Sequence, residues 1–183
     1  MANKFSYQVL KDDTQFAVIK ITGEFDGTGQ ENNVARIQAN TLSGALDSSK
    51  ANLLSSTANT GPLSYYGLTI NRVWFDTDSG VSDVQLYWSN TRSSLANSGT
   101  PIMLLQGNGE YDGAGNWITI KNPTVTNTAT TLHNGDIGIC TRGYVANSGY
   151  TLIMEFRKEN EYYQRGQFND PAAFNYGSYG IRP

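Results

Sequence analysis

The stretch of sequence that decides the fold covers residues 68–89 and reads LTINRVWFDTDSGVSDVQLYWS. Its first half is rich in β-branched and aromatic residues, and its second half alternates Val84, Leu86 and Trp88 with Gln85 and Tyr87. A side-chain pattern that repeats every second residue is typical of a strand with one face on a core. Asp, Ser and Gly between the two halves are turn-forming residues. The stretch therefore predicts two antiparallel strands joined by a turn.

Further runs of the same kind lie on both sides of this stretch. They fall at residues 5–10, 16–21, 34–38, 102–105, 117–120, 137–141 and 150–157. Turn signals such as Asn108-Gly109 and Asp112-Gly113 separate several of them. A parallel sheet would need crossover helices, and the sequence shows no strong helical pattern between the runs. We therefore expect an all-β fold, either an antiparallel β-sandwich or a jelly roll.

Length and composition predict one domain with an irregular C-terminal segment. The chain has 183 residues, of which 38% are hydrophobic and 11% aromatic, which is enough for one buried core. Residues 42–60 are mostly small and polar with spaced leucines, so we expect one long loop that can carry a short helix. The strand pattern stops near residue 157. We therefore expect a β-sandwich domain at 1–157 and an extended C-terminal arm at 158–183.

Charge and cysteine content argue against several classes of partner. The net charge is -3 and the 13 basic residues are scattered, whereas binding to phosphate backbones needs clustered Lys and Arg. No apolar run reaches the roughly 18 residues of a membrane helix. The single cysteine, Cys140, lies in an apolar run, so we expect a buried reduced thiol rather than a zinc site or a disulfide. We expect no nucleic acid, membrane, metal or cofactor partner.

Candidate catalytic residues are few, and we expect no enzyme. The single histidine, His133, has no nucleophile motif beside it. The carboxylate pairs Glu24 with Asp26 and Glu110 with Asp112 have the chemistry of the acid and base in sugar hydrolysis. Both pairs lie in glycine-rich stretches that we predict to be turns. Acids in turns usually accept hydrogen bonds from their own backbone, so we expect a structural role for these four.

Asp76, Asp78 and Asp83 suggest a calcium site, because loop carboxylates are ligands for hard cations. Their spacing does not fit the EF-hand pattern, in which an acid or amide occupies the fifth position and a glutamate follows later. Here Gly80 occupies the fifth position. We therefore expect a surface hairpin turn at these residues.

Carbohydrate binding is the main alternative function. The three tryptophans and eleven tyrosines supply aromatic faces on which sugar rings can stack. Trp88 and Trp117 fit strand patterns, so we expect both in the core. Trp74 lies between two apolar neighbours, so the alternation does not decide whether its side chain faces the core or the solvent. Together with Tyr65 and Tyr66 it forms a candidate exposed aromatic patch.

These features together resemble a known class of protein. The chain is an acidic β domain rich in Gly, Asn and Thr that leads into an aromatic C-terminal segment, and it contains GLTINRVWF at 67–75, YWS at 87–89 and GYTLIMEFR at 149–157. In this it resembles the small virion structural proteins of tailed bacteriophages, especially marine ones. The resemblance implies a capsid decoration or cement protein, or else a neck or tail component of the virion. The alternative from the residues themselves is a carbohydrate-binding β-sandwich module for host adhesion.

The resemblance also implies partners and a location. We expect a homo-oligomer, most simply a trimer, that is assembled in the host cytoplasm and is located in the virion, where it contacts the major capsid protein or other virion proteins. The C-terminal arm would supply contacts, because aromatic side chains act as anchors in pockets and arginines pair with carboxylates. The candidate partner-binding residues are Tyr162, Tyr163, Arg165, Phe168, Phe174, Tyr176, Tyr179 and Arg182.

Overall fold

The computed structural model describes residues 3–32, 34–44, 68–78, 82–88, 100–113, 120–121 and 136–158. These residues form strands and one short 3₁₀ helix, η1 (Ala39–Thr41). The strands are β1 (Lys4–Asp12), β2 (Phe16–Glu24), β3 (Val34–Ile37), β4 (Leu68–Thr77), β5 (Asp83–Trp88), β6 (Thr100–Gln106), β7 (Asn108–Asp112), β8 (Ile120–Lys121), β9 (Ile137–Arg142) and β10 (Gly149–Lys158).

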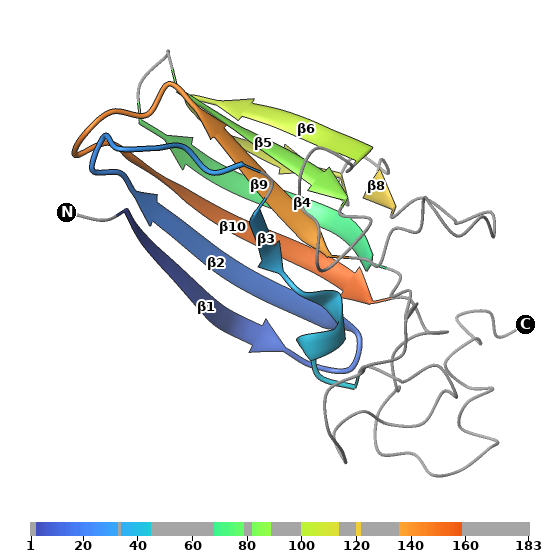
Figure 1. Ribbon diagram of the computed structural model, residues 1–183. Coiled ribbons are helices and arrows are strands. Elements are labelled where there is room, and N and C mark those ends of the chain that lie inside the picture. Colours follow the sequence, from blue (N-terminus) through green and yellow to red (C-terminus); the bar gives the residue numbers. More distant parts are fainter. Residues whose placement is uncertain are drawn as a thin grey trace, which may run out of the picture.

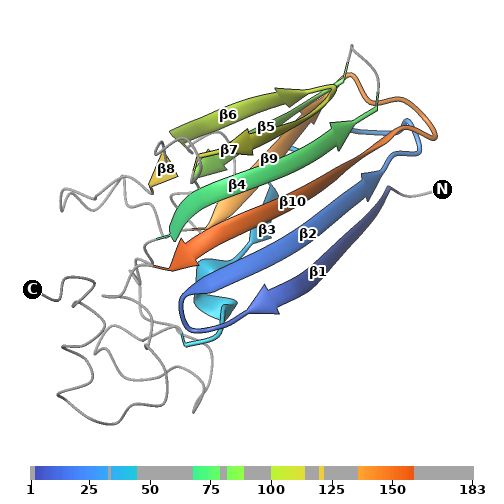
Figure 2. The ribbon, with the colours of Figure 1, turned by 180° about the vertical axis from the view of Figure 1, so that it is seen from behind.

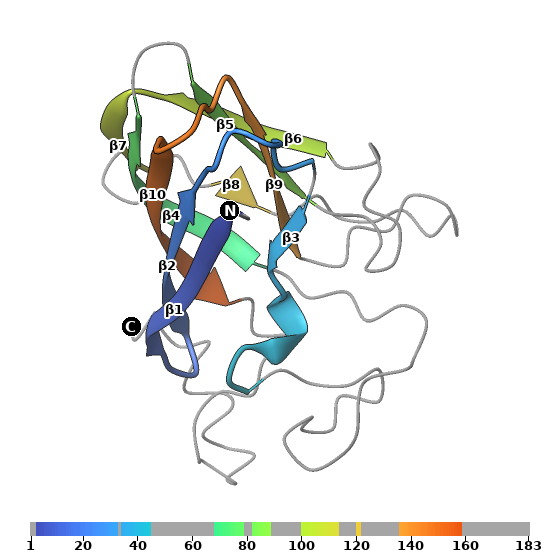
Figure 3. The same ribbon diagram turned by 60° about the vertical axis from the view of Figure 1, so that its left-hand side comes forward.

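The strands form two antiparallel sheets. The large sheet has the order β1-β2-β10-β4-β7, with β8 paired to β4, and the small sheet has the order β3-β9-β5-β6. Figures 1 and 2 show the two sheets from opposite sides, and in Figure 3 β2 and β10 lie in a different layer from β3 and β9. The predicted antiparallel β-sandwich is confirmed. This strand order does not by itself establish a jelly roll.

The core lies between the sheets and follows from the alternation of the strands. In β2 and β10 every second residue is buried, so one face of each strand is apolar and the other is solvated. Trp88 of β5 is 2% exposed, which confirms its predicted place in the core. Full burial of a large aliphatic side chain contributes about 2 kcal/mol. Fully buried aliphatic residues of the two sheets include Ile19, Ile21, Leu68, Ile70, Leu86, Ile137 and Leu152.

Several local predictions are wrong. Glu24 is the last residue of β2, and Glu110 and Asp112 lie in β7, instead of in glycine-rich turns. Gly109 belongs to the same strand as Glu110 and lies opposite Phe75 of β4, where a Cβ would be 2.9 Å from the Phe75 ring.

Asp76 and Asp83, predicted in a hairpin turn, belong to β4 and β5. Cys140 is half-buried instead of buried, since the alternation of β9 directs it away from the buried Ile139.

Several predictions fall outside the described residues. They concern most of the long loop, the C-terminal arm beyond residue 158 and a set of single side chains. These side chains are Tyr65, Tyr66, Trp117, His133, Tyr162, Tyr163, Arg165, Phe168, Phe174, Tyr176, Tyr179 and Arg182.

A buried lysine ends β10. Lys158, predicted as the first residue of the arm, is the last residue of this strand, and its side chain is 0% exposed. Its ammonium contacts the carboxylate of Asp12 and donates to the carbonyl oxygens of Asp13 at 2.5 Å and Ser43 at 2.8 Å. A buried charge is tolerated when such partners surround it. Lys158 thus joins β10, the β1–β2 turn and the segment after η1.

We expect Lys158→Met to lower the free energy of unfolding by about 3 kcal/mol, because Asp12 then loses its buried counter-ion. Urea denaturation measures this change. The matched control is Lys4→Met, since Lys4 pairs with Glu24 at 3.5 Å on the surface with both side chains more than 60% exposed. It should change stability by less than about 0.5 kcal/mol. Equal effects of the two substitutions would show that the buried pair has no special role.

Candidate functional site

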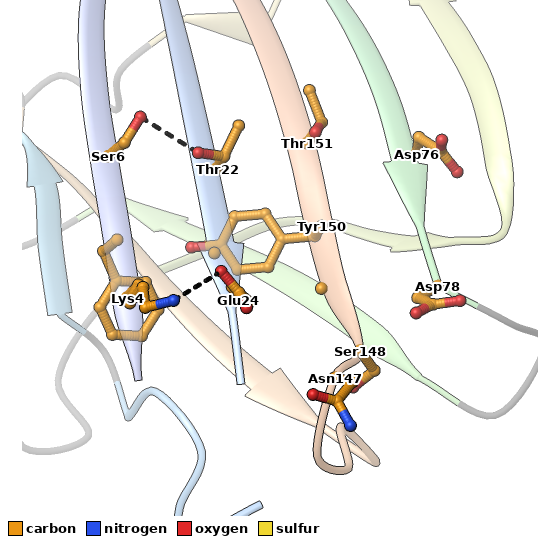
Figure 4. Close-up of a pocket in the computed structure, with 13 residues that line it drawn as sticks. Lys4, Ser6, Thr22, Glu24, Asp76, Asp78, Asn147, Ser148, Tyr150 and Thr151 are labelled. Carbon is orange, nitrogen blue, oxygen red and sulfur yellow. Dashed lines mark hydrogen bonds and ion pairs between the residues drawn. The ribbon is translucent and has the colours of Figure 1, made fainter. Parts of the chain in front are cut away.

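An open groove with a volume of about 690 Å³ lies on the outer face of the large sheet, where β10 begins (Figure 4). It is lined by residues from β1, β2, β4 and the start of β10, together with residues next to β4 and β10, all at one end of the sheet. The register places Thr22 opposite Thr151, and both side chains alternate with core residues. The polar residues of the groove are Lys4, Ser6, Thr22, Glu24, Asp76, Asp78, Asn147, Ser148, Tyr150 and Thr151.

A glycine of β10 keeps the middle of the groove open. Gly149 lies opposite Glu24, and its carbonyl oxygen accepts a hydrogen bond of 3.0 Å from the backbone N–H of Asp78. A Cβ at Gly149 would lie 2.3 Å from the carbonyl oxygen of Gly23. The backbone therefore approaches too closely for any side chain at this position. As a result, no side chain stands at position 149, on the floor of the groove between Glu24 and Asp78.

The turn before β10 is held against the segment that follows β2. The backbone N–H of Phe25 donates to Ser148 O at 2.9 Å, and the N–H of Asn147 donates to Phe25 O at 2.8 Å. Asn147 has a φ of 64°, a conformation that asparagine adopts more readily than most residues. The Ser148 hydroxyl closes the turn by donating to Val145 O at 2.6 Å. These bonds place the Asn147 side chain at the end of the groove (Figure 4).

A buried polar cluster supports the floor. The Tyr150 hydroxyl donates to Glu31 Oε2 at 2.5 Å, and Arg36 Nε donates to Glu31 Oε1 at 2.5 Å. The Arg36 guanidinium also lies 4.0 Å from the centre of the Phe5 ring. Burial raises the pKa of Glu31, although the bonds from Tyr150 and Arg36 oppose this shift. Burial, followed by the Glu31 charge, raises the pKa of Tyr150 as well, so the tyrosine remains a hydrogen-bond donor.

The groove is rich in carboxylates. On one side Lys4 pairs with Glu24 at 3.5 Å, and the Thr22 hydroxyl donates to Ser6 Oγ at 3.1 Å. On the other side Asp76 and Asp78 are exposed. Three carboxylates and one ammonium therefore line the groove. This arrangement favours hydrogen-bond donors and cations over anions.

Trp74 lies on the same outer face, next to the groove. It is partly exposed, and the register places it between Ile153 of β10 and Glu110 of β7. Asp76, which lines the groove, is two residues further along β4 and points to the same side. Trp74 is the member of the predicted aromatic patch that the structure describes, and it faces outward, whereas Tyr65 and Tyr66 lie outside the described residues.

The four candidate acids lie in β2, in the turn after β2 and in β7, and Glu24, Asp26 and Asp112 have different partners. Glu24 lies in the groove, whereas Asp26 lies in the turn beyond β2, where its Oδ1 accepts bonds from the N–H and the hydroxyl of Thr28 at 2.9 and 2.5 Å. These bonds lower the pKa of Asp26. Asp112 forms an ion pair of 3.0 Å with Arg72. Asp26 therefore has the structural role expected of a turn acid.

Metal ligands do not gather in the part of the chain that the structure describes. No three side chains of His, Cys, Asp or Glu converge there in a way that could hold an ion. Asp76 is the penultimate residue of β4 and Asp83 is the first residue of β5, so two of the three aspartates that suggested calcium belong to strands.

A second exposed feature is an apolar stripe on β1, formed by Tyr7, Val9 and Leu10. These side chains are 44%, 45% and 48% exposed. Tyr7 and Val9 lie opposite Ile21 and Ile19, so they point to the core side of the large sheet, but the small sheet leaves them uncovered. β1 is also an edge strand of the large sheet. We call these three residues the β1 stripe.

Sequence reasoning missed the β1 stripe, because alternation shows which residues share a face and not whether anything covers that face. One signal was present. Leu10 follows Val9 directly and breaks the alternation, and the register of β1 shifts at this point.

Comparison with known proteins gives no relative. No family model matches the chain, and none of the curated proteins or solved structures matches it significantly. Among the described residues, no helix has the length and apolar character needed to cross a bilayer.

We expect Gly149→Ala to lower the free energy of unfolding by about 2 kcal/mol, because the new methyl group collides with the backbone of β2. Gly29→Ala is the control, since a Cβ at Gly29 meets no atom within 4 Å. It should change stability by no more than about 0.5 kcal/mol. Thermal and urea denaturation measure both effects. A Gly149→Ala protein as stable as the control would contradict this description of the groove floor.

Proposed function

We propose that this chain is a virion structural protein that binds and stabilises a phage capsid as a decoration or cement protein. The observation that supports this most strongly is the β1 stripe. Among the described residues, three of the five large apolar side chains that are highly exposed belong to β1. Exposed apolar side chains that gather on one edge strand make this strand a candidate contact surface for another protein.

The chemistry of β1 favours side-chain docking on a specific partner. Removing three half-exposed apolar side chains from water contributes about 1 kcal/mol each. Lys4 and Lys11 stand at either end of the stripe and form surface ion pairs with Glu24 and Asp13. Charged residues and a register shift on an edge strand discourage indiscriminate strand pairing. The stripe can therefore bind a complementary surface without promoting aggregation.

The resemblance to phage virion proteins supplies the identity of the partner. We propose that the stripe contacts the major capsid protein or another virion protein, that the aromatic C-terminal arm adds a second contact, and that the protein acts as a homo-oligomer, most simply a trimer. Its location is the virion, after assembly in the host cytoplasm. The proposed role is structural rather than enzymatic and involves no nucleic acid or membrane. A position in the neck or tail is the alternative within the same particle.

We expect the double variant Tyr7→Ser, Val9→Ser to bind capsids about tenfold more weakly than the unmodified chain, because it loses apolar burial at the contact. Co-sedimentation with capsids assembled from the major capsid protein of the same phage measures this. The control is Leu104→Ser, which removes an apolar side chain that is 59% exposed on β6 of the small sheet.

Both proteins should remain folded at the temperature of the binding assay, since the substituted side chains are 44–59% exposed. Equal binding of the double variant and the control would overturn the role of β1. Binding to purified tails or necks, with none to capsids, would place the protein at the alternative position.

A further inference from the structure

We propose that the groove on the large sheet, together with Trp74, binds an oligosaccharide of neutral or amine-bearing sugars. This site lies on the outer face of the sheet, whereas the β1 stripe points to the core side of its edge strand. A protein attached to a capsid through β1 therefore has this face available for a second ligand. The inference goes beyond the structural role and adds a binding activity.

The groove offers the hydrogen bonds that sugars need. Sugar hydroxyls donate as well as accept, so they are best held by carboxylates together with amides and hydroxyls. Glu24, Asp76 and Asp78 supply acceptors, Asn147 supplies an amide and Thr151 supplies a hydroxyl. In Figure 4 these side chains border one open space from both sides. The volume of about 690 Å³ lies within the usual range for small-molecule sites.

Trp74 supplies the apolar face. A partly exposed indole on a sheet surface offers a large, rigid apolar area on which the C–H face of a sugar ring can stack. Residues two apart on one strand face lie about 7 Å from each other. Trp74 and Asp76 can therefore contact neighbouring units of one sugar chain.

Hydrogen bonds and a close backbone contact hold the groove residues in place. The backbone at Gly149 is fixed against β2, and Tyr150 is held from below by its bond to the buried Glu31. Ser6 and Thr22 are joined by their hydroxyls. Rigid sites lose less conformational freedom on binding, which favours affinity for a weakly interacting polar ligand.

The charges of the groove select the class of sugar. Three carboxylates against the single ammonium of Lys4 repel uronic and sialic acids and attract amine-bearing sugars. Neutral sugars meet no repulsion. Acidic oligosaccharides should therefore bind least well.

The test is an array of printed neutral, amine-bearing and acidic oligosaccharides, followed by titration of the best binder with tryptophan fluorescence as the signal. We expect signals on neutral or amine-bearing chains and none on acidic ones. Trp74→Ala should weaken binding about tenfold and Trp74→Phe by less, because phenylalanine keeps an aromatic face. Asp76→Asn should also weaken it. A Trp117→Phe background leaves Trp74 and the buried Trp88 as the tryptophans, so a fluorescence change on binding should disappear with Trp74.

Two controls separate this inference from the structural role. Leu104→Ser and the double variant Tyr7→Ser, Val9→Ser should bind the sugar as the unmodified chain does, while Trp74→Ala should still bind capsids. No signal on the array, a preference for acidic sugars, or undiminished binding by Trp74→Ala would each overturn the inference.

Discussion

The insertion of β10 between β2 and β4 is the constraint on which the rest of the structure depends. β10 is the last described strand, yet it lies inside the large sheet and pairs along its whole length with strands from much earlier in the chain. Leu152, Met154 and Phe156 are each 0% exposed and complete the core from its centre. Such pairing closes long loops, and its cost in chain entropy must be offset by the apolar surface that becomes buried. The large sheet is therefore complete only when β10 is in place.

Both ends of β10 have specific chemistry. At the start, Gly149 fits against the backbone of β2 and leaves the groove open beside it. At the end, the buried ammonium of Lys158 holds the β1–β2 turn through Asp12 and Asp13. This fixes β1 at the edge of the sheet, where the β1 stripe is exposed. The two candidate binding surfaces thus follow from the way one strand is seated.

Much of the fold could be predicted from the sequence, because strand alternation and turn residues are local signals. The run around Val84, Leu86 and Trp88 identified a strand on the core, and the absence of helical patterns identified the antiparallel sandwich. β7 was not predicted, because the glycine at position 109 is typical of a turn. A glycine is needed there because the Phe75 ring of another strand fills the space of a side chain. The buried charge of Lys158 could not be predicted from the sequence either, because its partners come from distant segments.

The candidate surfaces were predictable in part. Trp74 was a candidate for exposure because its two neighbours in the sequence are apolar, and the structure places it on the outer face. The groove depends on the alignment of four segments and on a glycine whose neighbour is the backbone of another strand, which no local pattern reveals. The exposure of β1 depends on where the small sheet ends, which is also a property of the assembled fold.

The most direct test of the central claim, that β1 is the face that contacts the particle, is site-specific photo-crosslinking in assembled virions. A photo-reactive phenylalanine analogue would replace Tyr7 in one preparation and Leu104 in another, and the crosslinked products would be identified by mass spectrometry. The account predicts a crosslink to the major capsid protein, or to another virion protein, from position 7 and none from position 104. Crosslinks from position 104 with none from position 7 would contradict it.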